Sequence, residues 1–375
     1  MPGQAPHICF VAPTAYSIVS DDKHVKIVGG AEVQQNLFAK ALVKKGFQVS
    51  MICMDHGQDE ELVIDGVRII KAYQPNAGIP LLRFFHPRLS SIWKGMKQAN
   101  ADIYMQLSAG MLTGVVTAFC KLNNKKSIFY AASDADFRKN PTHIKYRRDL
   151  WLYQYGVRHA DKILIQNPNQ QRLCKLMYNR DSVQVPNVYA LPESATNNPN
   201  GYILWVSTIR QLKRPELFLE LAKLFPQYQF KMVGGVSSSD EMLYQSIKTQ
   251  ADVLTNIEFV GFVPYSKVDS YFDGARLVIN TSDYEGFPNA FLQAWARKIP
   301  TVSFFDCGAR ADDQSVGFIV ETLDEMSHVV EKLMTDDMEW RAQGVRCQAH
   351  FIENNSIEHG IDLYIDIFTA MLNEV

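Results

Sequence analysis

The chain has 375 residues, of which 47% are hydrophobic and 21% are charged, and its formal net charge is −2. This length predicts two globular domains, and the composition excludes both a disordered chain and a membrane-embedded one. The first residues lack the basic segment and apolar stretch of a signal peptide, and no run approaches the roughly 18 apolar residues of a spanning helix, so we expect a cytoplasmic protein.

Charge is divided unevenly along the chain. Residues 1–189 contain 24 Lys and Arg against 14 Asp and Glu, a balance of +10, and the remaining residues contain 14 against 26, a balance of −12. A basic amino-terminal half predicts an anionic partner, either a phosphorylated acceptor or an anionic membrane surface. Attraction between the two halves is the structural alternative. We expect no nucleic-acid partner.

Strands and helices alternate in the amino-terminal half. Residues 7–12 have the length of a buried parallel strand, and residues 31–45 carry apolar side chains at helical spacing as far as Gly46. Residues 47–53 are the next predicted strand, which completes a βαβ unit. Further strands are predicted at residues 67–72, 103–106, 127–131 and 162–165. This order is typical of a doubly wound α/β domain, expected over residues 1–190.

A polar stretch rich in Pro and Asn, residues 186–200, interrupts this order and predicts an interdomain linker. A second α/β domain is expected over residues 191–355, with helices at 215–225 and 242–251. Its strands are predicted at residues 202–206, 229–233, 257–260, 277–280 and 301–304. The last segment, residues 356–375, has the pattern of an amphipathic helix that needs an apolar surface to cover.

The most informative segment runs from Thr281 to Trp295, directly after a predicted strand, and reads T-S-D-Y-E-G-F-P-N-A-F-L-Q-A-W. Ligands bind at the carboxyl ends of strands in open α/β sheets, and amides at a helix start favour an anion. Glu285 would project from this loop, where a carboxylate can accept hydrogen bonds from sugar hydroxyls. Taken alone, a Glu before a Gly-containing turn is typical of a solvated surface.

This segment, followed by R-K-I-P-T-V from Arg297, resembles the donor-binding signature of glycosyltransferase family 4. That family has the GT-B fold and retains anomeric configuration. The resemblance implies an α/β protein with two Rossmann-like domains facing a central cleft, and a final helix that crosses back to the first domain. It also implies a nucleotide-sugar donor and a carbohydrate or lipid-linked acceptor, in the synthesis of a cell-surface polysaccharide or glycolipid.

The resemblance assigns roles within the segment. Glu285 is implied to contact donor-sugar hydroxyls, and the backbone near the sugar and diphosphate is implied to be that of Gly286, Phe287, Pro288 and Asn289. The second glutamate of the family signature, which holds the ribose hydroxyls of the nucleotide, is replaced by Gln293. An amide oxygen can also accept these hydrogen bonds.

Two further stretches resemble the family. Gly29 and Gly30 fall in its Gly-Gly-x-Glu loop, where absent side chains let the backbone approach the donor phosphates; alone, Gly-Gly is typical of a turn. In the second domain Lys213 falls on a lysine that contacts the diphosphate, Thr208 stands at the usual arginine position, and Arg210 is the expected substitute. Both cations would stabilise a departing nucleoside diphosphate. An exposed, solvated loop is the alternative for this basic cluster.

The sequence S-D-A-D ending at Asp136 contains Asp-x-Asp, which binds metal in GT-A enzymes but also caps helices and turns. Many members of the resembled family carry a His near this place, and Asp134 is the predicted replacement. The nine histidines and six cysteines have no metal-ligand spacing, and the cysteines are expected to be reduced packing residues. We therefore predict no metal and no cofactor apart from the donor substrate.

Three alternatives stay open. An NAD-dependent oxidoreductase is disfavoured because Pro13 and its neighbours follow the first strand in place of G-x-G-x-x-G. Epimerases and phosphorylases also have the GT-B fold, so the fold alone does not decide the reaction. A catalytically weak carbohydrate-binding relative is the third alternative, because Gln293, Thr208 and the missing His are departures from the family.

Residues 79–97 interleave apolar and aromatic side chains with Arg83, Arg88, Lys94 and Lys97. The apolar residues are predicted to be the core face of a helix. The alternative is peripheral contact with the anionic inner face of a membrane, which the basic group around Arg138, Lys139, Lys145, Arg147 and Arg148 also favours.

Overall fold

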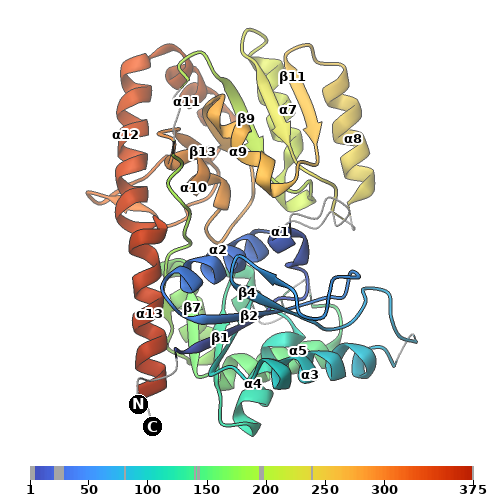
Figure 1. The fold of residues 1–375 in the computed structure, drawn as a ribbon. Helices are drawn as coiled ribbons and strands as arrows, with labels where there is room; N and C mark the ends of the chain where they lie inside the picture. Colours follow the sequence, from blue (N-terminus) through green and yellow to red (C-terminus); the bar gives the residue numbers. More distant parts are fainter. Residues whose placement is uncertain are drawn as a thin grey trace. The chain divides into compact units, whose positions relative to one another are not determined.

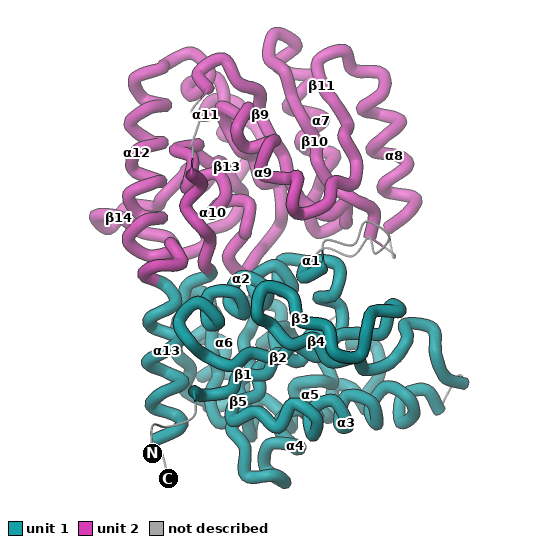
Figure 2. Tube along the Cα trace, in the orientation of Figure 1, with its two compact units in different colours: residues 1–187, 360–375 teal, residues 188–359 magenta. Residues whose placement is uncertain are grey.

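The computed structural model describes residues 5–20, 29–79, 82–138, 141, 144–193, 198–237 and 240–373 (Figure 1). The chain forms two compact units (Figure 2). Unit 1 comprises Met1–Asn187 and Gly360–Val375, and unit 2 comprises Val188–His359. The boundary between the units thus lies three residues before the one expected after residue 190.

Unit 1 is built on an eight-stranded sheet, in which only β3 and β4 pair antiparallel. In spatial order its strands are β3 (Val63–Ile64), β4 (Val67–Lys71), β2 (Gln48–Cys53), β1 (His7–Val11), β5 (Ile103–Leu107), β6 (Lys126–Tyr130), β7 (Lys162–Ile165) and β8 (Val183–Gln184). Ile8, Cys9 and Phe10 of the central strand are fully buried. Consecutive buried residues are expected when helices cover both faces of a parallel sheet.

The sheet of unit 1 is covered by helices from both ends of the sequence. Its helices are α1 (Tyr16–Ser20), α2 (Gly30–Lys44), the π-helical turn η1 (Phe84–Leu89), α3 (Ser90–Ala99), α4 (Met111–Leu122), the 3-10 helix η2 (Asp134–Phe137), α5 (Arg147–His159), α6 (Pro168–Tyr178) and most of α13 (Ile357–Asn373). Helix α13, red in Figure 1, packs Tyr364 on Phe38 of α2 with ring centroids 4.4 Å apart. The crossing of the last helix back to the first unit is confirmed.

Helices α4 and α5 approach each other closely at two glycines. A Cβ atom on Gly156 of α5 would lie 2.5 Å from the carbonyl carbon of Thr113, and one on Gly114 of α4 would overlap the backbone of Leu152. Contacts this short leave no room for a side chain, so both positions require Gly. By contrast, a Cβ on Gly110, which precedes α4, would meet nothing within 4 Å.

Unit 2 is built on a six-stranded sheet in which every neighbouring pair is parallel. Its strands lie in the order β11 (Ile257–Gly261), β10 (Phe230–Val233), β9 (Tyr202–Val206), β12 (Ala275–Asn280), β13 (Thr301–Ser303) and β16 (Phe318–Ile319). A separate hairpin joins β14 (Arg310–Ala311) to β15 (Gln314–Ser315). Trp205 and Phe218 belong to the apolar core of this unit.

The helices of unit 2 follow its strands in the doubly wound order that the sequence predicted. They are the 3-10 helix η3 (Gln211–Lys213), α7 (Pro215–Leu224), α8 (Glu241–Asp252), α9 (Tyr265–Asp273), α10 (Asn289–Trp295), α11 (Leu323–Thr335) and α12 (Asp337–Asn354). Pro215 opens α7 at its first position, where the missing N–H leaves no hydrogen bond unmade.

The structure divides the segment at residues 79–97 into two parts. Helix α3 buries Ile92 and Met96 in the core, as the helical interpretation requires. Before this helix the helical backbone is interrupted at His86 (φ −137°, ψ 127°), and there Leu82 and Phe85 are more than half exposed while Phe84 is buried. The segment is therefore core on its carboxyl-terminal side and surface on its amino-terminal side. Leu81, like Lys139 of the basic group, lies outside the described residues.

Candidate functional site

The order in which the chain adds strands to the sheet of unit 2 reverses at the centre of the sheet. Strand β9 pairs with β10 on one side and with β12 on the other. The later strands β13 and β16 lie beyond β12, so the loops that follow β9 and β12 leave the sheet at the point where the strand order reverses. Loops at the carboxyl ends of such strands form the binding crevice of open α/β sheets. The loop after β9 carries Lys213, and the loop after β12 carries Glu285.

Lys213 and Glu285 are joined by an ion pair in which the Lys213 ammonium donates to Oε1 of Glu285. Both side chains are largely buried, with exposed fractions of 15% and 16%. The Asn280 amide donates to the same oxygen at 3.4 Å, and the hydroxyl of Ser282 lies 2.8 Å from it. Within the described residues, Oε2 of Glu285 has no hydrogen-bond partner, so one carboxylate oxygen stays available to a ligand.

Hydrogen bonds beneath the ion pair join the two loops. The Trp205 indole on β9 donates to the Thr281 hydroxyl at 3.0 Å, and this hydroxyl donates to the carbonyl of Lys213 at 2.6 Å. The amide of Asp283 donates to the carbonyl of Leu212 at 3.0 Å. These contacts fix the backbone beneath Lys213 and Glu285, so the pair is supported by buried polar groups.

The side chains of the other two residues predicted in the first of these loops, Arg210 and Thr208, make no hydrogen bond or ion pair with Lys213 or Glu285, although the Lys213 amide donates to the Arg210 carbonyl at 3.0 Å. Arg210 is exposed and precedes η3, and Thr208 is partly buried just after β9. Arg214, which follows Lys213, pairs with Asp283 at 3.1 Å and lies over the Phe304 ring. The predicted roles of Arg210 and Thr208 stay predictions, whereas Lys213 is brought to Glu285.

The segment after Glu285 leads directly into α10. Pro288 precedes the first residue, Asn289, and Phe287 packs edge-on against Trp295 with ring centroids 5.8 Å apart. Gly286 is buried within the same turn. Gln293, one turn further, is 3% exposed, and its amide Nε2 donates to Oδ1 of Asp269 at 2.9 Å.

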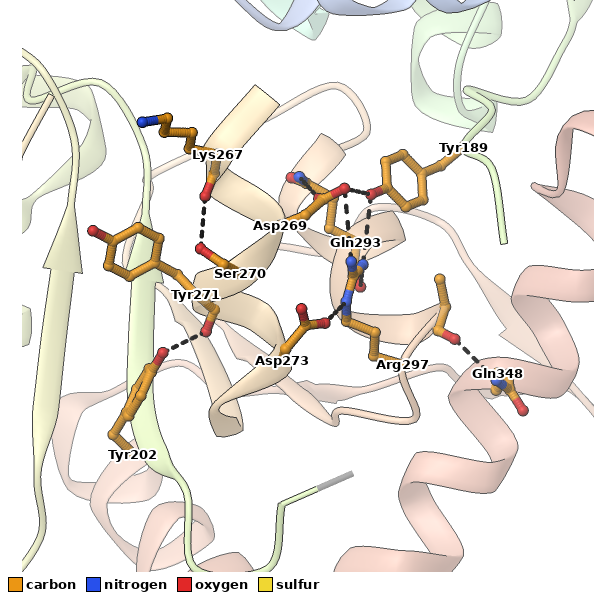
Figure 3. A network of polar contacts seen from close by, with 11 residues as sticks. Tyr189, Tyr202, Lys267, Asp269, Ser270, Tyr271, Asp273, Gln293, Arg297 and Gln348 are labelled. Carbon is orange, nitrogen blue, oxygen red and sulfur yellow. Dashed lines mark hydrogen bonds and ion pairs between the residues drawn. The ribbon is translucent and has the colours of Figure 1, made fainter. Parts of the chain in front are cut away.

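Asp269 on α9 is the centre of the polar network in Figure 3. Its Oδ2 accepts a hydrogen bond from the Tyr189 hydroxyl at 2.6 Å and lies 3.6 Å from the Arg297 guanidinium. Arg297 also donates to Asp273 at 2.7 Å and to the carbonyl of Gln293 at 3.1 Å. Burial alone would lower the pKa of Arg297, but Asp273, Tyr189 and Asp269 raise it. Burial and Asp269 raise the pKa of Tyr189.

In unit 1, Gly29 and Gly30 begin α2. Gly29 is the extended residue before the helix, and a Cβ there would overlap the carboxylate of Glu32. That carboxylate folds back over the start of the helix and accepts a hydrogen bond from the Thr14 hydroxyl. The Gly-Gly-x-Glu loop thus brings a carboxylate to the start of α2. Val28 lies outside the described residues.

The two aspartates of the Asp-x-Asp sequence have separate partners. Asp136 is buried and accepts from the amide of Ala132 at 2.8 Å, within a capping box with Ser133. Asp134 accepts from the side chains of Asn167 at 3.1 Å and Asn169 at 2.6 Å. Asp136 is thus a cap, as the structural alternative predicted, and the catalytic role of Asp134 stays a prediction.

Neither a metal centre nor a membrane-spanning helix is found in the described ranges. There, no three His, Cys, Asp or Glu side chains gather in a way that could hold a metal ion. Of the helices the structure describes, none is both long and apolar enough to cross a bilayer. All six cysteines are buried as free thiols.

Sequence reasoning missed several residues of this site. Ser282 stands in the segment that drew attention to Glu285, and Asn280 is the last residue of the fully buried strand before it. Polar residues at the carboxyl end of such a strand are a usable signal for both. Asp269 and Tyr189 lie far from that segment in the sequence. Only the packing of α9 against α10 brings Asp269 to Gln293, and Tyr189 joins the network through Asp269.

Two family models match the chain. Residues 7–167 match the family described as glycosyl transferase 4-like, and residues 191–354 match the family described as glycosyl transferases group 1. The matched ranges correspond to the two units. Two parallel α/β units with the last helix packed on the first define the GT-B class of protein, so the predicted fold is confirmed.

Individual proteins agree with this class. The chain is 30% identical over 154 residues to the O-antigen biosynthesis glycosyltransferase WbnH of Escherichia coli, a match that covers 41% of this chain and 43% of the relative. The match thus spans less than half of that relative. Sucrose-phosphate synthase from Thermosynechococcus elongatus shares the fold with a TM-score of 0.77 at 15% identity, covering 98% of this chain and 99% of that one.

Anabaena HepE, solved in complex with UDP and glucose, has a TM-score of 0.71 at 13% identity and covers 97% of this chain and 100% of its own. The chain therefore belongs to the GT-B glycosyltransferases.

Proposed function

We propose that this protein transfers a sugar from a nucleotide-sugar donor to a carbohydrate or lipid-linked acceptor, with retention of anomeric configuration and without a metal ion. The observation that carries the proposal is the pair formed by Lys213 and Glu285 at the carboxyl ends of neighbouring strands β9 and β12. A cation suits a diphosphate, and a carboxylate suits sugar hydroxyls. Side by side, the two groups match the two halves of a nucleotide sugar.

Binding of a donor would separate the pair. The diphosphate would take Lys213 as its counterion, and Glu285 would exchange the ammonium for sugar hydroxyls while keeping its contacts with Asn280 and Ser282. Arg210 would add a second cation. The backbone from Gly286 to Asn289 would lie near the sugar, and Gln293 near the nucleotide.

In the transfer step the bond between the anomeric carbon and the distal phosphate oxygen breaks, and a bond from the acceptor oxygen to the anomeric carbon forms on the same face. The departing phosphate takes the acceptor proton. Positive charge at Lys213 stabilises the negative charge that develops on the leaving group. This stabilisation would take the place of a metal ion. In unit 1, Gly29 and Gly30 would admit the phosphates, and Asp134 would contact the transferred sugar.

A polysaccharide or glycolipid acceptor agrees with the O-antigen relative, and a lipid-linked acceptor agrees with one surface of unit 1. This aromatic-basic surface comprises the largely exposed side chains of Ile79, Leu82, Phe85, Tyr146 and Trp151, together with Arg83 and Arg148. Arg148 joins its two segments by stacking on Phe84 at 3.3 Å from the ring centroid. Exposed aromatics beside cations suit an anionic headgroup layer, so we propose peripheral contact there.

The test is a screen of UDP-, ADP- and GDP-sugars for thermal stabilisation, followed by an assay for release of nucleoside diphosphate with and without EDTA. A tightly bound donor raises the melting temperature, because it binds only the folded state. Release that depends on an acceptor and persists in EDTA supports a transferase. An epimerase would convert the sugar without release, a phosphorylase would need inorganic phosphate, and a catalytically inactive relative would never turn the donor over.

A further inference from the structure

Arg88 differs from the other arginines of the chain that are not exposed to solvent. The guanidinium of each of those others donates to a carboxylate or a backbone carbonyl; they are Arg180, Arg214, Arg276, Arg297 and Arg346. Arg88 lies in the last turn of η1 and is partly buried, yet its guanidinium has no hydrogen-bond or ion-pair partner among the described residues. A partly buried cation without a counterion costs free energy, which an anionic ligand would recover.

The guanidinium of Arg88 is enclosed at its base and open at its tip. Its Nε is buried and has no hydrogen-bond partner. Neither Nη nitrogen is among the buried unpaired atoms, and neither has a partner in the described part of the chain, so both reach the surface. Two Nη groups form a fork that can hold two oxygens of a carboxylate or a phosphate. Because the enclosed Nε keeps part of the group away from water, an oxyanion at the tip is attracted more strongly than it would be at an exposed arginine.

Tyr73 supplies a hydroxyl beside this fork. The central carbon of the Arg88 guanidinium lies 5.8 Å from the centroid of the Tyr73 ring, within the range of a cation–π contact. Burial raises the pKa of Tyr73, and the charge of Arg88 acts in the opposite direction. Over the described ranges the Tyr73 hydroxyl has no hydrogen-bond partner, and it is not one of the buried unpaired atoms. A protonated hydroxyl in this position can donate a hydrogen bond to an anion held by Arg88.

Tyr73 stands at the carboxyl edge of the sheet of unit 1. It follows β4, and its carbonyl accepts a hydrogen bond at 2.9 Å from the amide of Asp55, which follows β2. The amide of Met54 donates to the carbonyl of Pro13, which follows β1, at 2.8 Å. These bonds join the loops after three neighbouring parallel strands. Open α/β sheets bind their ligands at this edge, so Arg88 and Tyr73 are placed where a ligand is expected.

The carboxylates of the adjoining loop do not neutralise Arg88. Asp55 lies 4.0 Å from the ammonium of Lys71, and Glu60 lies 2.9 Å from the same ammonium. Lys71 is the last residue of β4 and is 18% exposed, so both carboxylates serve a different cation. The charge of Arg88 therefore remains without a counterion in the part of the chain that the structure describes.

We propose that Arg88 and Tyr73 form a subsite for an oxyanion of the acceptor, either a carboxylate on a sugar ring or the phosphate that links a glycan to its lipid. The two Nη groups of Arg88 bind two oxygens of the anion, and the Tyr73 hydroxyl donates to one of them. This inference rests on the proposed function, because it assigns the anion to the acceptor. It narrows the acceptor from any glycan to an anionic one, which agrees with the balance of +10 in residues 1–189, from 24 Lys and Arg against 14 Asp and Glu.

The test measures anion binding at Arg88 itself, by NMR of protein with isotopically labelled arginine. A buried Nε–H exchanges slowly with water, so its signal is resolved, and Arg88→Lys identifies the signal by removing it. Sodium phosphate and methyl glucuronide are titrated separately, with sodium chloride at equal ionic strength as the reference. The Nε–H of Arg276 is the internal control, because it is buried but already donates to the carbonyl of Leu333 at 2.9 Å.

We expect a saturable shift of the Arg88 signal with phosphate or glucuronide, no such shift with chloride, and an unmoved Arg276 signal. Tyr73→Phe should weaken anion binding by about threefold, since one of the donors is lost. The anion that binds more tightly identifies the source. A lower dissociation constant for phosphate indicates a lipid-phosphate linkage, and a lower one for glucuronide indicates an acidic sugar.

Melting temperatures separate binding from a structural role. Arg88→Met removes the cation but keeps an apolar stem, and it should leave the melting temperature of the ligand-free protein unchanged or raise it, because no counterion is lost. Arg276→Met is the matched control and should lower it, since Arg276 pairs with Asp337 at 2.7 Å. A loss in Arg88→Met as large as in Arg276→Met would assign Arg88 to the architecture of unit 1 and overturn the subsite.

The outcomes also distinguish this inference from the proposed function. If a nucleotide sugar binds and is turned over while the Arg88 signal responds to neither anion, or responds equally to chloride, the proposed function stands and the inference is wrong. If the Arg88 signal responds but nucleoside diphosphate is never released, the anion site stands, and both the proposed function and the assignment of the anion to an acceptor are overturned.

Discussion

The ammonium of Lys213 and the carboxylate of Glu285 neutralise each other in a largely buried position, although the two residues are separated by 72 positions in the chain. Breaking a buried ion pair by removing one partner leaves the other charge uncompensated. A ligand that supplies both an anion and hydroxyls avoids this cost, because each member of the pair receives a new partner. The pair therefore disfavours ligands that offer only one of these groups.

Replacement of Lys213 by Ala should lower turnover at least tenfold, a loss of about 1.4 kcal/mol or more in the transition state, because charge on the leaving group is then stabilised less. Acceptor-dependent release of nucleoside diphosphate is the measurement. Arg214→Ala is the control, since Arg214 is the next residue and pairs with Asp283 in a more exposed position. Equal turnover in folded Lys213→Ala and wild-type protein would refute the role.

Replacement of Glu285 by Gln should lower turnover more than tenfold while changing the dissociation constant of the nucleoside diphosphate less than about threefold. An amide accepts hydrogen bonds through one oxygen only. Its NH₂ group would place two donors where the sugar hydroxyls need an acceptor. Steady-state kinetics and calorimetry measure the two quantities. Lost diphosphate binding with unchanged sugar selectivity would mean that Glu285 contacts another part of the donor.

Contact with anionic membrane should depend on charge. We expect the protein to sediment with vesicles of phosphatidylcholine and phosphatidylglycerol, to stay in solution with phosphatidylcholine alone, and to be released as salt rises from about 0.05 to 0.5 M. Arg83→Glu with Arg148→Glu should weaken binding, since both residues are exposed cations of the aromatic-basic surface, and Lys248→Glu on α8 of unit 2 is the control. Arg88 is less suitable because its Nε is buried. Equal partition onto both vesicle types would rule out the proposed contact.

Replacement of Gly156 by Ala should destabilise unit 1 by about 3 kcal/mol, because the new methyl group meets the backbone of α4 and cannot be accommodated by a rotamer change. Chemical denaturation measures the free energy of unfolding. Gly110→Ala should change it little, since its backbone is extended and a Cβ there meets nothing. Similar effects of the two substitutions would show that α4 and α5 are not packed this closely.

Burial raises the pKa of the Cys53 thiol to about 12, while an unfolded thiol titrates near 8.5. Between these values the unfolded state loses its proton and the folded state keeps it, so the free energy of unfolding falls as pH rises from about 9 to 12. One thiol contributes a slope of at most about 1.4 kcal/mol per pH unit. Cys53→Ala should show a shallower slope in urea titrations at several pH values. Parallel slopes would contradict burial of this thiol.

Sequence patterns located the long elements well. Strands β7 and β9 have the predicted bounds, and α7 differs from prediction by one residue at its end, because continuous apolar runs and helical periodicity are local signals. The strands β3, β8, β14, β15 and β16 were missed, since two residues are too few to show a period.

The site was predictable only where its residues are neighbours in sequence. Glu285 and Lys213 were found through motifs, each in its own loop. Asp269 was not, because its relation to Gln293 depends on how two helices pack. The exposed position of Arg210 depends likewise on the course of one loop, which spacing does not determine.

Helix α13 also bears on how the chain is made. Unit 1 needs Tyr364 and Phe368 to cover Phe38 of its core and the partly buried Phe47, but the ribosome adds both residues after all of unit 2. Domains generally fold as units during synthesis, the amino-terminal one first. Unit 1 is therefore translated first but completed last. The apolar surface around α2 stays exposed while the ribosome translates the 172 residues of unit 2, Val188–His359.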